Sequence, residues 1–124
     1  LDTYLPRLVK AGYRVAICEQ LEKPSKEKKI VRRGVTEIVT PGLAVNDKLL
    51  EHKRNNYLAC VSYAGGKQDI YGLSLLDIST GEFLAAEGAA DYVDKLLQSF
   101  QPKEVLINKG RSKDFLKTFG DRFY

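Results

Sequence analysis

Residues 69–83 have the sequence D-I-Y-G-L-S-L-L-D-I-S-T-G-E-F. The first ten of them, 69–78, are mostly apolar, which predicts a strand in the centre of a sheet. Ser79-Thr80-Gly81 is typical of a tight turn, and residues 82–87 predict the next strand. Strands joined by so short a turn pair antiparallel, so this stretch predicts the middle of a sheet.

The residues around this stretch predict a layered domain. Residues 57–64 (Y-L-A-C-V-S-Y-A) predict a strand, and Gly65-Gly66 favours a turn that completes an antiparallel meander. A helix is expected over roughly 89–100, with a buried face of Tyr92, Val93, Leu96, Leu97 and Phe100 and an end at Pro102. A short buried strand at 104–108 and a helix at 112–119 follow, with Ser112 as N-cap and Gly120 as the end. The order β-β-β-α-β-α predicts an α/β domain with a mixed sheet.

The first part of the chain predicts a smaller mixture of helix and strand. Residues 1–11 favour a helix that ends at Gly12, because apolar residues recur there at spacings of three and four. These residues are Leu1, Leu5, Leu8 and Val9, with Tyr4 alongside. Pro6 either kinks this helix or lies in its first turn. Strands are expected at 13–19 and 35–40, the second ended by Pro41-Gly42, and a connection with a helical turn around 48–52 is expected at 43–55.

Composition excludes several classes of protein. No apolar run approaches the ~20 residues that a membrane span requires, and the mixed charges of the first ten residues do not resemble a signal peptide. The chain has no methionine, so we expect a processed chain or an internal piece of a longer one.

Cys18 and Cys60 lie in apolar stretches, which favours buried free thiols over one disulfide. His52 lies in a charged stretch, which favours a surface residue over a metal ligand.

Positive charge is concentrated in one loop. Residues 1–55 carry 12 Lys and Arg against 7 Asp and Glu, whereas residues 56–124 carry 8 against 9. Residues 21–33 (L-E-K-P-S-K-E-K-K-I-V-R-R) alone hold six positive and two negative side chains. Such a loop is either a solvated surface segment or a contact for phosphates, whose neutralisation by Lys and Arg releases counterions. Arg32-Arg33 is the stronger signal, since guanidinium groups bind phosphate at two points.

Two sets of motifs resemble the MutS mismatch-repair family over essentially the whole chain. The first comprises Tyr4-Leu5, Leu8-Val9, Gly12, V-A-I-C-E-Q at 15–20, the Lys-rich loop, Val31, Arg33, Val35 and I-V-T-P-G at 38–42. The second comprises Asn55-Asn56-Tyr57-Leu58, Tyr71-Gly72, L-D-I-S-T-G-E-F at 76–83 and Q-P-K-E-V-L at 101–106.

The resemblance implies a domain plan and a biological role. Residues 1–42 would end a small mixed α/β mismatch-binding domain, 43–55 would be a linker, and 56–124 would begin a connector domain with a ribonuclease H-like fold. The parent would be a cytoplasmic, nucleoid-associated bacterial homodimer. It would bind mismatched double-stranded DNA and use ATP and magnesium to signal to a MutL-type partner.

Two family motifs are absent from the chain. None of its five phenylalanines begins the F-x-E motif with which the family detects mismatches by wedging an aromatic ring into the base stack. The phosphate-binding G-x-x-x-x-G-K-[ST] loop is also missing. We therefore expect the mismatch reader upstream of Leu1 and the ATPase elsewhere in the parent. This chain would hold no cofactor and would not be an enzyme by itself.

What remains for the chain is to contact the DNA backbone, which fixes register without carrying sequence information. By motif position, Arg33 matches the family's basic residue at the DNA-facing start of the last strand of the mismatch domain. The predicted contact residues are, in order of preference, Arg33, Arg32, Lys28 and Lys29, with Lys26 in the same loop.

Two rival interpretations stay open. In the first, Asp77 is a metal ligand of a nuclease, although two-metal chemistry needs several converging carboxylates. The alternative is a structural role, in which Asp77 supports the turn at 79–81 through backbone N–H groups. In the second, the nearly neutral residues 56–124 form an interaction module that contacts no DNA. The serines lack a histidine partner for nucleophilic catalysis and are interpreted as structural.

Overall fold

A four-stranded mixed sheet forms the larger part of the molecule in the computed structural model, which describes residues 3–23, 30–43, 55–65 and 69–123. Its strands are β3 (Tyr57–Gly65), β4 (Ile70–Asp77), β5 (Glu82–Ala89) and β6 (Glu104–Ile107), in the order β5-β4-β3-β6. β3, β4 and β5 pair antiparallel, whereas β6 runs parallel to β3. The predicted meander, the central position of β4 and the mixed α/β fold class are confirmed.

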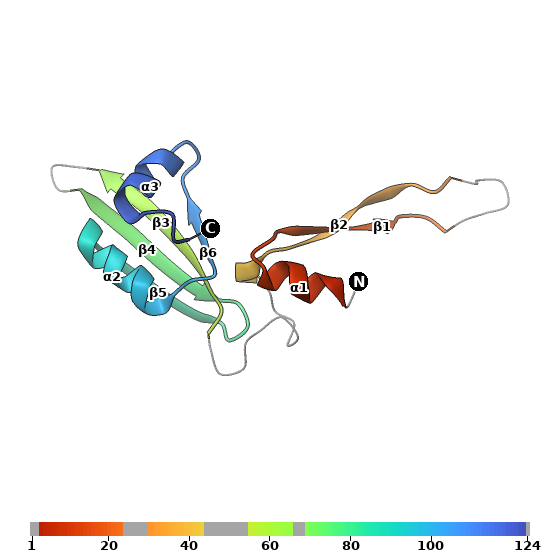
Figure 1. Cartoon of the computed structure of the whole chain (residues 1–124), viewed down its shortest axis with the longest axis horizontal. Helices are drawn as coiled ribbons and strands as arrows, with labels where there is room; N and C mark the ends of the chain where they lie inside the picture. The colour runs from red at the N-terminus through yellow and green to blue at the C-terminus, as the bar shows by residue number, and fades with distance from the viewer. Residues whose placement is uncertain (1–2, 24–29, 44–54, 66–68, 124) are drawn as a thin grey trace.

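Helices α2 (Ala90–Phe100) and α3 (Ser112–Phe119) lie over one face of this sheet (Figure 1). Side chains alternate across a strand, so every second residue of β3 and β4 points to the helices. The core on that face consists of Tyr57, Ala59, Val61, Leu73, Leu75, Val93, Leu97 and Phe119. The opposite face, which carries Cys60, is not covered by these helices and leaves Cys60 exposed.

A smaller unit precedes the sheet. Helix α1 (Tyr4–Lys10) packs on β1 (Val15–Gln20), which pairs antiparallel with β2 (Arg33–Val39). Its small core consists of Val9, Ile17 and Val39. We call the β1–β2 ladder the arm, because it extends away from the four-stranded sheet in Figure 1. A 3-10 turn, η1 (Pro41–Leu43), follows β2 and lies against β3 and β6.

Several predictions about burial are wrong. Both cysteines are free but exposed, because each lies on a strand face that none of the described helices covers. The strand expected at 13–19 begins only at Val15, as β1, and Tyr13 before it is exposed. Tyr92 is 49% exposed because its ring lies over Gly88 of the edge strand β5.

Two predictions about the last elements also need correction. β6 was expected to be buried but pairs with β3 alone among the described strands, and its Leu106 is 44% exposed. Ser112 is not an N-cap: Arg111 holds that position and no side chain caps the helix. Gly120 ends α3 as predicted, with φ of 78°.

Some expectations concern residues outside the described ranges. They are the turn after Gly65, the helical turn at 48–52, His52 and most of the connection at 43–55. Pro6 lies within the first turn of α1, where a proline is tolerated. No helix in the described ranges is both long and apolar enough to cross a membrane.

Candidate nucleic-acid interface

The pairing of β1 with β2 separates the arm into two different faces. Val15 pairs with Val39 and Ile17 with Glu37, and this face packs on α1 near its base. A register shift between Ile17 and Cys18 leaves one extra residue in β2, which increases the local twist. The other face carries the pairs Ala16–Ile38, Cys18–Val35 and Gln20–Arg33. Of these six side chains only Arg33 is charged, whereas Glu19 and Glu37 point to the α1 side.

Arg33 lies at the end of the arm remote from the four-stranded sheet. The opposite end of β2 leads into η1, which contacts that sheet. Arg32 and Arg33 are both exposed, and neither forms an ion pair with another residue of the described ranges. The Arg32 backbone N–H donates to the Glu22 carboxylate at 3.3 Å, and the Arg32 carbonyl accepts from Leu21 N–H. Both guanidinium groups therefore lie where a phosphate could reach them.

The other three predicted contact residues cannot be placed. Lys26, Lys28 and Lys29 lie outside the described residues. The structure therefore brings together Arg32 and Arg33 of the predicted set at the remote end of the arm.

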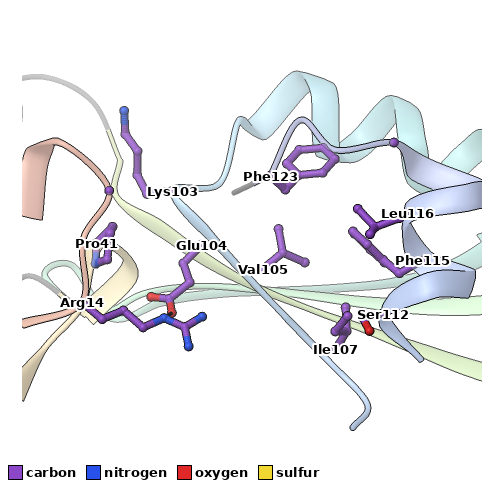
Figure 2. Close-up of a pocket in the computed structure, with 12 residues that line it drawn as sticks. Arg14, Pro41, Lys103, Glu104, Val105, Ile107, Ser112, Phe115, Leu116 and Phe123 are labelled. Carbon is purple, nitrogen blue, oxygen red and sulfur yellow. Dashed lines mark ion pairs between the residues drawn. The ribbon is translucent and has the colours of Figure 1, made fainter. Parts of the chain in front are cut away.

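At the base of the arm, a group of polar contacts that we call the junction holds η1 against the sheet. Glu104 of β6 accepts hydrogen bonding from Gly42 N–H at 3.2 Å through one oxygen and pairs with Arg14 Nε at 3.3 Å through the other. Asn56, just before β3, donates its side-chain N–H to the Pro41 carbonyl at 2.9 Å. Figure 2 shows the Arg14 guanidinium beside the Glu104 carboxylate.

The two partners of this ion pair are in different environments. The Glu104 side chain is 10% exposed, whereas that of Arg14 is 70% exposed. An ion pair with so exposed a partner contributes at most about 1 kcal/mol. A carboxylate that is largely removed from water must however be satisfied by donors. Burial therefore makes Glu104 depend on its partners more strongly than Arg14 does.

Gly42 permits the close contact in the junction. A Cβ at this position would lie 3.0 Å from Glu104 Cβ and 3.2 Å from Leu58 Cβ. Leu58 and Glu104 are neighbours in the parallel pairing of β3 with β6. The turn therefore lies directly on two adjacent strands, with room for hydrogen alone.

The entry to β3 is held by a second carboxylate. Asp77 is 1% exposed, and its Oδ2 accepts from Asn56 N–H at 2.9 Å. Its Oδ1 accepts from the Ser79 N–H at 2.9 Å and the Ser79 hydroxyl at 2.6 Å, and more weakly from Thr80 N–H. Burial raises the pKa of Asp77, but these hydrogen bonds, led by that of the Ser79 hydroxyl, outweigh it and the net pKa is lowered.

These contacts confirm that Asp77 supports the turn at 79–81. Both of its oxygens are occupied by donors of the chain itself, which leaves it poorly suited to bind a metal. In the described part of the chain, no three His, Cys, Asp or Glu side chains are grouped as metal ligands.

Next to Asp77, Tyr57 closes the same end of the sheet. Its hydroxyl donates to Glu82 at 2.5 Å, and Asn55 donates to both the hydroxyl and the carboxylate at 2.6 Å. The hydrogen bond to Glu82 raises the pKa of Tyr57, and burial adds to this effect. The residues that lead the chain into β3 are therefore fixed by side chains of β3, β4 and β5.

A cleft of about 400 Å³ lies between the junction and α3. Arg14, Pro41, Lys103 and Glu104 line it on the junction side, and Val105, Ile107, Phe115, Leu116 and Phe123 line the remainder (Figure 2). It combines a polar end with an apolar wall along the edge of β6 that pairs with none of the described strands.

Two family models match the chain in succession. The model described as MutS domain I matches residues 1–48, and the model described as MutS domain II matches residues 56–121. The chain belongs to the MutS family.

Its relatives include bacterial proteins named DNA mismatch repair protein MutS. Those of Parabacteroides distasonis and Flavobacterium psychrophilum are 58% and 57% identical over 124 residues, which is 100% of this chain. That of Cytophaga hutchinsonii is 58% identical over 123 residues, or 99% of the chain. The chain spans 14% of the length of each of these relatives.

Sequence reasoning missed the junction in this MutS segment. Glu104 was assigned to a short strand and a family motif, and Arg14 to one face of the strand expected at 13–19, with no contact between them. The motif I-V-T-P-G at 38–42 carried one signal, since glycine, which has no Cβ, is often used where another part of the chain approaches the backbone closely.

Proposed function

We propose that this chain serves DNA mismatch repair in two ways. The remote end of its arm contacts the DNA backbone without sequence preference, and the junction couples the arm to the sheet that follows. In this proposal, residues 1–42 end the mismatch-binding domain, 43–55 link it, and 56–124 begin the connector domain. The matches to MutS domains I and II support the assignment to this pathway.

The observation that carries the DNA contact is the position of Arg33. It is exposed at the remote end of the arm, on a face whose other paired side chains are uncharged. Phosphate groups of a duplex are repelled by carboxylates and attracted by guanidinium groups, so this face suits a DNA backbone better than the face with Glu19 and Glu37. Arg32 adjoins it, and Lys26, Lys28 and Lys29 belong to the same proposed contact.

The proposal extends to the parent protein. The parent would act on mismatched double-stranded DNA, as a homodimer in the bacterial cytoplasm close to the nucleoid. ATP and magnesium would be bound, and ATP hydrolysed, in parts of the parent outside this chain. A MutL-type protein would be the partner that receives the signal.

The test compares Arg33→Ala with the unsubstituted full-length parent in DNA binding at several salt concentrations. We expect affinity for matched and mismatched duplexes to fall by a similar factor of roughly five, equivalent to about 1 kcal/mol. The negative slope of log affinity against log salt should become flatter by about 0.9, because one phosphate contact is lost. Arg111→Ala, which removes an exposed arginine beside α3, is the matched control and should change neither quantity.

A loss of affinity confined to mismatched DNA would contradict the proposal, because a backbone contact cannot distinguish the two duplexes. An unchanged salt slope would contradict it as well.

A further inference from the structure

The junction holds the arm through a small number of contacts. The described contacts between the arm unit and the four-stranded sheet centre on η1, which touches β3 and β6. Because β1 and β2 are paired along their length, a rotation at the base of the arm changes the position of its far end. The direction of Arg33 therefore depends on how firmly η1 is held.

Glu104 is the residue that joins most of these contacts. Its carboxylate binds both the backbone of η1, at Gly42, and a side chain ahead of β1, at Arg14. Arg14 comes directly before β1 and Gly42 follows β2, so the two groups lie beside the base ends of the two strands of the arm. A single largely buried carboxylate thus holds both strands at their base.

The position of Glu104 is itself fixed. It begins β6 and pairs with Leu58 of β3, so its backbone belongs to the sheet. Its carboxylate therefore provides a fixed point on the sheet to which the arm is attached. Asn56 adds a second hydrogen bond to η1, through the Pro41 carbonyl.

We propose that Glu104 is a positioning residue that sets the direction of the arm relative to the four-stranded sheet. Without its carboxylate the arm keeps its own ladder but pivots about η1. This inference deepens the proposed coupling role of the junction. Its consequence for repair rests on the proposed function, in which Arg33 contacts DNA.

The two native cysteines allow a direct measurement of the pivot. Cys18 lies on the arm and Cys60 on the sheet; both are free and exposed, and the chain has no others. Nitroxide labels at these sites report the distribution of distances between the two units by pulsed electron paramagnetic resonance. The experiment uses the whole 124-residue chain without DNA, so its outcome does not depend on DNA contact.

We expect a single narrow distribution for the unsubstituted chain and at least a doubling of its width for Glu104→Ala. Glu104→Gln keeps an oxygen for Gly42 N–H but loses the charge that attracts Arg14, so its width should lie between the two. Arg14→Ala should resemble Glu104→Gln. Glu87→Gln, which neutralises an exposed glutamate on β5, is the matched control and should leave the width unchanged.

An unchanged width for Glu104→Ala, with unchanged circular dichroism, would overturn the proposal. Should Glu104→Ala fail to fold, unchanged widths for both Glu104→Gln and Arg14→Ala would overturn it.

A second measurement separates positioning from DNA contact. In the full-length parent, Glu104→Gln should weaken duplex binding about twofold to fivefold without changing the salt slope, because no phosphate contact is removed. A flatter dependence of log affinity on log salt would mean that Glu104→Gln removes a phosphate contact, and this would overturn the positioning role of Glu104. If Arg33→Ala proves silent while Glu104→Ala broadens the distances, the proposed function fails and the positioning role stands.

Discussion

At the scale of single residues, Asp77 is the most constrained polar group in the described part of the chain. Asp77→Asn replaces one acceptor oxygen with an N–H₂ donor, which must face the N–H of Asn56 or the donors of Ser79. We expect the free energy of unfolding in urea to fall by about 1.5 to 3 kcal/mol, because hydrogen bonds to a charged group are lost. Asp121→Asn, at an exposed position, should change it by less than about 0.5 kcal/mol. Equal effects of the two substitutions would contradict this account.

The lowered pKa of Asp77 also predicts a pH dependence. A carboxyl group whose pKa is lower in the folded than in the unfolded chain stabilises the fold above the unfolded value, which is about 3.9 for Asp. This stabilisation is lost as the pH falls through the folded pKa. The difference in unfolding free energy between the unsubstituted chain and Asp77→Asn should therefore shrink below about pH 4. A difference that stays constant from pH 7 to pH 2.5 would refute the prediction.

Thr40 offers a stabilising substitution. Its side chain is buried, and its hydroxyl has no hydrogen-bond partner among the described residues. Thr40→Val replaces the unsatisfied hydroxyl with a methyl group, so we expect a gain of about 1 kcal/mol in unfolding free energy. Thr36→Val is the control, because the Thr36 hydroxyl donates to the Ile17 carbonyl and its removal should bring no gain. Thermal unfolding of both variants measures the difference, and a loss of stability in Thr40→Val would count against the argument.

Individual burial was the part of the fold that sequence predicted least well. Alternation along β3 correctly indicates that Ala59 and Cys60 point to opposite faces, but it does not indicate which face the helices cover. Cys60 was therefore predicted to be buried, from its apolar neighbours, although it is exposed. Tyr92 has the spacing of a buried residue, and only the position of Gly88 on the edge strand explains its exposure.

At the scale of elements, the fit of η1 against the sheet depends on Gly42. Gly42→Ala places a Cβ against the Cβ atoms of Glu104 and Leu58, which are close to the backbone and cannot move aside. We expect the unfolding free energy to fall by about 1 to 3 kcal/mol. At Gly34, the nearest atoms to an added Cβ would all belong to the exposed side chain of Leu21, with its Cδ1 at 3.0 Å. Gly34→Ala is therefore the control, with an expected change of less than about 1 kcal/mol, and similar losses for both would contradict this interpretation.

The elements themselves were largely predictable because local patterns specify them. The apolar run at 69–78 and the turn residues at 79–81 predicted β4, its turn and β5, and the support of this turn by Asp77 followed from the same few residues. The junction was not predictable, because Gly42 and Glu104 are 62 residues apart. No local spacing connects them, and only the parallel pairing of β6 with β3 brings them together.

At the scale of the whole molecule, the chain should bind DNA weakly by itself. The F-x-E motif is absent, so any binding would depend on backbone contacts through the arm. We expect dissociation constants of about 10⁻⁴ to 10⁻⁶ M at physiological salt, as for non-specific binding, with equal values for matched and mismatched duplexes. Fluorescence anisotropy with both labelled duplexes measures this. A preference for the mismatch above tenfold would show that the chain detects mismatches directly.

The separation of Gly42 from Glu104 along the chain also has a consequence for biosynthesis. Translation at about 5 to 20 residues per second delivers the second residue roughly 3 to 12 s after the first. A hairpin closes within microseconds, so the arm can form long before β6 exists. The nascent protein must then complete the meander and α2 and begin β6 before Glu104, which holds the β1–β2 hairpin, is in place. Docking is therefore a late event of folding, and a ribosome that pauses between these positions would hold a formed but unattached hairpin.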